Sequence, residues 1–148
     1  MTLQTFDLDL IHFFRRISIP VARFGLFVVF FWFGALKVIG QSPAGPLVED
    51  LFNHTFPPIM TFGAFIVLFG LFECLIGLLF LIPGTERVVI PLLLIHMVTT
   101  VMPLFAIPTA TWSGLMVPTL EGQYIIKNLL IIAAAVGIAA HLHPLRVR

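Results

Sequence analysis

The sequence predicts an all-α membrane protein, a single domain in which four transmembrane helices form a bundle. Two observations lead to this prediction. Hydrophobic residues make up 59% of the chain and charged residues 10%, with a mean hydropathy of +1.10, which lies outside the range of soluble globular domains. Apolar runs of about 20 residues, long enough to cross the hydrocarbon core, also recur along the 148 residues, which hold about four of them. No length remains for a separate soluble module.

A short amphipathic helix is predicted over residues 7–18, ahead of the first span. Charged residues lie on one side of this helix. On the other side, apolar side chains recur at helical spacing: Leu10, Phe13, Phe14 and Ile17. Basic residues beside an apolar stripe are typical of a helix that lies in the membrane interface. Because proline breaks or kinks helices, we expect Pro20 to end this helix. The first span then covers residues 21–39, and we expect its many aromatic side chains to face lipid.

The second span is predicted over residues 59–82 and carries a seven-residue glycine repeat. The repeat places small residues on one stripe, where a neighbouring helix can approach closely: Gly63, Gly70 and Gly77, with Gly84 just beyond the span. Glu73 lies three residues after Gly70 and four before Gly77. It therefore belongs to the stripe, and we expect it to face protein rather than lipid.

The third span is predicted over residues 88–107, after a tight turn at Pro83 and Gly84. Pro103 is expected to break or kink its end. The fourth span is predicted over residues 123–140. It carries small residues that suit close helix packing: Ala133, Ala134, Ala135, Gly137, Ala139 and Ala140.

Two connections, residues 42–58 between the first and second spans and residues 103–118 between the third and fourth, are largely apolar and rich in proline and glycine. Non-helical backbone at membrane depth is tolerated where protein buries it, so we expect these connections to fold back as an apolar outer cap. In the first, a short helix is predicted from four apolar residues on one side: Leu47, Val48, Leu51 and Phe52. Trp112 in the second is expected to be an interfacial anchor.

Basic residues fall on one side of the predicted spans. They precede or begin the first span, occupy the second connection and end the chain: Arg15, Arg16, Arg23, Arg87, Arg146 and Arg148. Residues 41–58 and 103–122 contain no lysine or arginine. The positive-inside rule therefore predicts cytoplasmic termini, as expected for the bacterial inner (cytoplasmic) membrane. The acidic residues Asp7 and Asp9 argue against a cleavable signal peptide, so we expect insertion by the spans themselves.

Four ionisable residues within or beside the apolar runs form the candidate ligand-binding site: Glu73, His96, Lys37 and Lys127. A carboxylate at the centre of a transmembrane helix costs roughly 3 kcal/mol or more, so Glu73 is a functional-site hypothesis that requires a partner. With a rise of about 1.5 Å per residue, Glu73 and His96 both fall near mid-membrane. Lys37 and Lys127 fall roughly 5 Å below the outer surface on the same scale.

Three interpretations of this set remain open. Lys37 and Lys127 snorkel to the outer head groups while Glu73 is protonated or hydrogen-bonded between helices. Alternatively, Glu73 and His96 form the floor of a polar pocket that opens outward between the two lysines and accepts an anionic or quinone-like head group. A proton or ion pathway is the third interpretation.

The cysteine and the other histidines do not predict a redox, metal or catalytic site. Cys74 is the only cysteine, which excludes an internal disulfide or a dithiol pair, and it is expected to pack as a small hydrophobe. His141 and His143 are two residues apart, a spacing that does not place both on one helix face, so no metal site is predicted. His54 is expected to be an exposed loop residue. No catalytic residue is predicted, and the absence of a basic patch argues against a nucleic-acid partner.

Several short motifs resemble the DoxX-type membrane proteins. They extend over most of the chain: Arg23-Phe24-Gly25, Gly34-Ala35-Leu36-Lys37, Gly70-Leu71-Phe72-Glu73, Gly77-Leu78-Leu79, Glu121-Gly122-Gln123-Tyr124 and Lys127-Asn128-Leu129. The stretch from Trp32 to Lys37, with Ser42-Pro43, is also similar to the YkgB/RclC branch of that group.

This resemblance implies a four-helix membrane bundle of a kind that includes quinone-linked thiosulfate oxidation subunits, redox-stress proteins and assembly chaperones. It also implies that Lys37, Glu73 and Lys127 correspond to polar positions that recur in the family. The absence of paired cysteines departs from related four-helix bundles that carry out thiol chemistry.

Three functions follow as hypotheses. The first is binding of a lipophilic redox molecule, such as a quinone, or another part in membrane redox or stress processes through the polar pocket. The second is a non-catalytic structural or assembly subunit of a larger membrane complex. The third is a small-molecule or proton carrier. The expected partners are the lipid membrane and either another membrane protein or a second copy of the chain.

Overall fold

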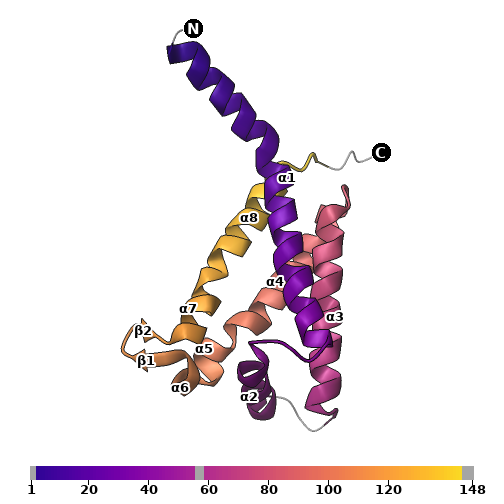
Figure 1. Cartoon of the computed structure of the whole chain (residues 1–148), viewed down its shortest axis with the longest axis vertical. Helices are drawn as coiled ribbons and strands as arrows, with labels where there is room; N and C mark the ends of the chain where they lie inside the picture. The colour runs from indigo at the N-terminus through magenta and orange to yellow at the C-terminus, as the bar shows by residue number, and fades with distance from the viewer. Residues whose placement is uncertain (1–2, 56–58, 145–148) are drawn as a thin grey trace.

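The structure is a computed structural model that describes residues 3–55 and 59–144, and it is built almost wholly from helices (Figure 1). Four helical segments are long and apolar enough to cross a membrane: Leu3–Val38, Phe62–Leu81, Glu86–Ala106 and Leu120–Ala139. The predicted all-α fold with four transmembrane helices is confirmed. Arg146 and Arg148, used above for topology, lie outside the described residues.

Helix α1 (Leu3–Val38) is continuous, so the expected separation at Pro20 is wrong. Proline removes one backbone donor from a helix, but the remaining turns hold the helix when its flanks are strongly helical, and transmembrane helices often accommodate it. The N-terminal part of α1 extends beyond the bundle, and the side chains of residues 3–16 are exposed (Figure 1).

Helix α3 (Phe62–Leu81) packs closely against α1 through glycine. A Cβ atom added to Gly70 would lie 2.6 Å from the carbonyl oxygen of Gly34, and one added to Gly77 would lie 2.7 Å from the amide nitrogen of Phe31. Only glycine, which has no Cβ atom, allows the backbones of α1 and α3 to lie this close together. The predicted stripe therefore faces a neighbouring span at its two central positions, while a Cβ added to Gly63 would meet open space.

The third and fourth spans are each interrupted once. Helix α4 (Glu86–Val101) is followed by α5 (Pro103–Ala106), which begins at the proline expected to break the span. Helix α7 (Leu120–Lys127) is followed by α8 (Leu129–Ala139). The apolar core lies between α1, α3, α4 and α8 and includes Leu26, Phe30, Ile76, Phe80, Val89, Leu93, Met97, Ala135 and Ile138.

The remaining elements gather at the end of the bundle opposite the two termini (Figure 1). They are α2 (Gly45–Thr55), α6 (Pro108–Thr111) and the antiparallel pair β1 (Trp112–Gly114) and β2 (Val117–Pro118). Phe52 of α2 is buried and its ring contacts Phe62 and Phe65, as the apolar side of the predicted short helix requires. The indole of Trp112 donates to the carbonyl of Leu104 at 3.0 Å, so it ties the connection to α5.

Candidate functional site

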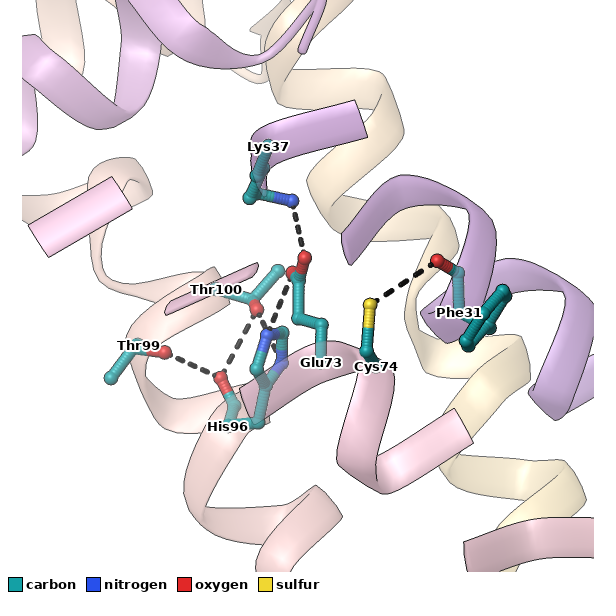
Figure 2. A network of polar contacts seen from close by, with 7 residues as sticks. All are labelled: Phe31, Lys37, Glu73, Cys74, His96, Thr99 and Thr100. Atoms are coloured by element: carbon teal, nitrogen blue, oxygen red, sulfur yellow. Dashed lines mark hydrogen bonds and ion pairs between the residues drawn. The ribbon is translucent and has the colours of Figure 1, made fainter. Parts of the chain in front are cut away.

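Glu73 faces the interior of the bundle and contacts two other helices. Its Oε2 atom lies 2.6 Å from Nζ of Lys37 on α1, and its Oε1 atom lies 2.9 Å from Nε2 of His96 on α4 (Figure 2). The three residues are 5%, 6% and 4% exposed, respectively. The carboxylate thus bridges a lysine and a histidine where little water can reach it.

Lys37 reaches Glu73 because of the close packing of α1 on α3. Side chains of a helix tilt toward its N-terminus, so Lys37, in the last turn of α1, extends back into the bundle. Its Cβ would be only 2.8 Å from a Cβ added to Gly70, so the lysine stem crosses α3 where that helix has no side chain. The ammonium then meets Glu73 one turn further along α3. Snorkelling of Lys37 to the outer head groups is therefore wrong.

His96 has contacts on both ring nitrogens and with two aromatic rings. Nε2 contacts Glu73, and Nδ1 lies 3.1 Å from Oγ1 of Thr100, one turn later on α4. The ring of Phe69 stacks on the imidazole at 5.0 Å between centroids with an interplanar angle of 12°. Phe30 meets it edge-on at 5.3 Å. These contacts fix the ring orientation, and we call Lys37, Glu73, His96 and Thr100 the polar cluster.

Lys127 does not join the polar cluster. It lies on α7 with an exposed side chain, and its Nζ atom is 5.2 Å from the ring centroid of Tyr124 on the same helix. Within the described residues its ammonium makes no ion pair with Glu73. The depth estimate gave Lys127 a height in the membrane, but the rotation of α7 about its axis directs this side chain away from the interior.

Thr99 and Thr100 were missed by sequence reasoning. Their hydroxyl oxygens lie 2.7 Å and 3.0 Å from the backbone carbonyl oxygen of His96 (Figure 2). The spacing of four between His96 and Thr100, which places both on one helix face, was a usable signal. Phe30 and Phe69 gave no such signal, because aromatic residues are frequent throughout the chain.

The polar cluster is buried, and two hollows lie elsewhere on the described part of the chain. One hollow of about 350 Å³ lies near the α3–α4 turn and is lined by Ile19, Pro20, Arg23, Phe24, Phe80, Leu81 and Pro83. A second, of about 170 Å³, is lined by Phe31, Trp32, Ala35, Leu36 and Ile39 of α1. Neither is lined by a member of the cluster. The side chains that were expected to border a cavity instead contact one another.

Arg23 forms a second polar site, toward the end of the bundle that holds the termini. Its Nε and Nη2 atoms donate to the carbonyl oxygens of Phe80 and Ile82 at 2.8 Å and 2.6 Å, and Nη1 forms an ion pair with Glu86. The carbonyl groups at a helix C-terminus have no partner within the helix, so Arg23 caps α3. The sequence analysis used this residue for topology and in the family resemblance, and it did not predict the cap.

Three other side chains considered in the sequence analysis contact backbone carbonyl oxygens. The Cys74 thiol lies 3.6 Å from the carbonyl oxygen of Phe31, across the contact between α3 and α1 (Figure 2). His54 lies in α2 and not in a loop as expected, and its Nδ1 atom is 2.8 Å from the carbonyl oxygen of Asp50. His141 follows α8, and its Nδ1 atom is 2.8 Å from the carbonyl oxygen of Gly137. In the described parts of the chain, no three histidine, cysteine or acidic side chains are grouped to hold a metal ion.

Comparison with known proteins gives no match to a family model, to a curated protein or to a solved structure. The class of protein is therefore defined by the fold and the site alone. It is an integral membrane protein with four apolar helices and a lysine–glutamate–histidine cluster buried between three of them.

Proposed function

We propose that this chain is a small membrane protein of the DoxX type that binds the head group of a lipophilic redox molecule, such as a quinone, at the polar cluster. The observation that carries the proposal is the bridging position of Glu73 between Lys37 and His96. Ionisable side chains inside a membrane are costly, and they commonly mark the sites of ligand, ion or proton handling.

The chemistry of the polar cluster suits a quinone head group. Quinone carbonyls accept hydrogen bonds, and an ammonium group has three hydrogens to donate. The ammonium of Lys37 donates one of them to Glu73. The same ammonium lies 5.7 Å from the ring centroid of Phe69, whose flat face borders the cluster. Because the cluster is buried, a head group reaches it only when neighbouring side chains move aside.

We further propose that the protein resides in the bacterial inner membrane with both termini in the cytoplasm. Four basic residues precede the last turns of α1 or begin α4: Arg15, Arg16 and Arg23 of α1, and Arg87 in the first turn of α4. Arg87 also donates to the carbonyl of His143 near the C-terminus. Such an arrangement agrees with the positive-inside rule.

A structural or assembly subunit is the second candidate, and one observation favours it. Among the described residues, every buried side-chain nitrogen and oxygen has a hydrogen-bond partner. A cluster that satisfies its own polar groups holds α1, α3 and α4 in register without any ligand. On this account the cluster stabilises the packing of the bundle and does not bind a molecule.

The discriminating experiment is mass spectrometry of lipids, quinones and proteins that co-purify with the full chain in mild detergent. We expect quinone with the wild type and several-fold less with Glu73→Gln or His96→Leu. Lys127→Met, which alters an exposed lysine outside the cluster, is the matched control and should retain quinone. Equal retention in all variants would rule out the cluster as the binding site. A stoichiometric protein partner without quinone would favour the second candidate.

A further inference from the structure

We infer that His96 is a reversible proton-binding site inside the bundle, and that the Thr100 hydroxyl group is what allows its ring to take up a second proton. The ligand in this case is the proton itself. The inference goes beyond the proposed function, because it requires no quinone or other bound molecule.

The neutral ring has one arrangement that satisfies both nitrogens. Nε2 of His96 lies 2.9 Å from a carboxylate oxygen of Glu73, which can only accept, so Nε2 carries the hydrogen. Nδ1 is then an acceptor. The hydroxyl of Thr100, 3.1 Å away, donates to it.

A second proton is accommodated by turning one hydroxyl group. When a proton bonds to Nδ1, that nitrogen becomes a donor, and Thr100 Oγ1 accepts from it. The Thr100 hydroxyl hydrogen then turns to the backbone carbonyl oxygen of His96, 3.0 Å away. One N–H bond forms and one O–H bond of a hydronium ion from the surrounding water breaks, no electrons are transferred, and the charge of the ring changes from zero to +1.

The backbone carbonyl of His96 is satisfied in both states. Thr99 Oγ1 donates to it at 2.7 Å. Thr99 can therefore keep the carbonyl hydrogen-bonded while Thr100 is turned toward the ring. Loss of a hydrogen-bond partner by a buried polar group is costly, and neither protonation state causes such a loss in this set.

The electrostatic surroundings favour reversible uptake. Glu73 of α3 faces the ring directly, and Lys37 of α1 faces it through Glu73. Helix α7, which also packs against α4, carries Glu121, Tyr124 and Lys127, whose side chains are exposed, and α8 contains no titratable residue. With a protonated ring, the carboxylate lies between two cations. The added charge therefore has a counter-charge in contact with the ring.

The test is nuclear magnetic resonance of the full chain, labelled with ¹⁵N-histidine, in quinone-free lipid nanodiscs. The chain has five histidines, so His96→Gln identifies the His96 signals. In a series from about pH 8 to pH 5, we expect the Nε2–H neutral tautomer at the alkaline end and a doubly protonated ring after acidification.

Three variants separate the role of Thr100 from a purely structural one. Thr100→Val removes the ring partner with little change in shape, and we expect about tenfold less protonated His96 relative to neutral His96 at matched pH, because the added N–H has no acceptor. Thr100→Ser keeps the hydroxyl and should restore uptake. Thr99→Val is the matched comparison: it removes a hydroxyl that contacts the carbonyl oxygen of His96, and it should not lower the protonated fraction as Thr100→Val does.

Four results would overturn the inference. They are a neutral ring throughout this pH range, an Nδ1–H tautomer at alkaline pH, wild-type titration of Thr100→Val, and an equal effect of Thr99→Val. Because no quinone is present, each of these outcomes is independent of whether the protein binds one. Loss of quinone binding with normal proton uptake would contradict the proposed function and leave this inference standing.

Discussion

Nζ of Lys37 lies 2.6 Å from Oε2 of Glu73, and this ion pair joins the end of α1 to the middle of α3 in the interior of the bundle. Charged groups in such surroundings lose their hydration, and only a close partner and further hydrogen bonds compensate for that loss. His96 supplies the further bond, on the other carboxylate oxygen. The pair therefore depends on the packing of three helices.

The first prediction concerns the coupling of Glu73 with Lys37. Glu73→Gln should lower the free energy of unfolding in detergent by about 3–5 kcal/mol, because it leaves the lysine ammonium buried without its counter-charge. Adding Lys37→Met should recover part of that loss, since both charges are then absent. The measurement is a thermal melting series on the single and double variants.

Lys127→Met provides the control for this series, because its side chain is exposed and outside the polar cluster. Its effect should add to that of Glu73→Gln without coupling. Strict additivity of Glu73→Gln and Lys37→Met would contradict the ion pair.

The second prediction concerns the glycines between α1 and α3. Gly70→Ala and Gly77→Ala should each destabilise the fold by about 1–3 kcal/mol, because the added methyl overlaps backbone atoms of α1. Gly137→Ala on α8 is the matched control. A Cβ there meets open space, and alanine is the better helix former by up to about 1 kcal/mol, so this variant should be neutral or more stable. Equal melting temperatures for all three would refute the close approach.

The third prediction concerns the cap on α3. Arg23→Met should lower the free energy of unfolding by about 2–3 kcal/mol, because it removes donors to the carbonyls of Phe80 and Ile82 and leaves Glu86 without its partner. Arg16→Met removes the same charge from an exposed position of the same helix and should have little effect. Chemical or thermal denaturation would measure both. If the two variants melt alike, Arg23 does not cap α3.

The fourth prediction is the orientation in the membrane. In a Cys74→Ala background, Glu49→Cys on α2 should react with an impermeant thiol reagent added outside intact cells, and His143→Cys should not, because the basic residues are retained in the cytoplasm. Both positions are exposed, so access to the reagent depends on the side of the membrane. Labelling of position 143 alone would reverse the proposed topology.

The sequence by itself determined the spans and one inward-facing residue. Hydropathy and length are local properties, so residues 59–82 were predicted close to the observed α3, Phe62–Leu81. The register of Gly70, Glu73 and Gly77 determined that the acid faces protein, since helical periodicity fixes which residues share a face.

Only the tertiary structure decided which cation pairs with that acid. Lys37 and Lys127 fall at similar depth in the sequence estimate, but the choice between them depends on how each helix is rotated and how closely it packs. The contact of Gly34 with Gly70 brings Lys37 across α3, while α7 directs Lys127 outward. Packing among several helices likewise decides that α1 continues through Pro20 and that Lys37, Glu73 and His96 contact one another. No single segment specifies these results.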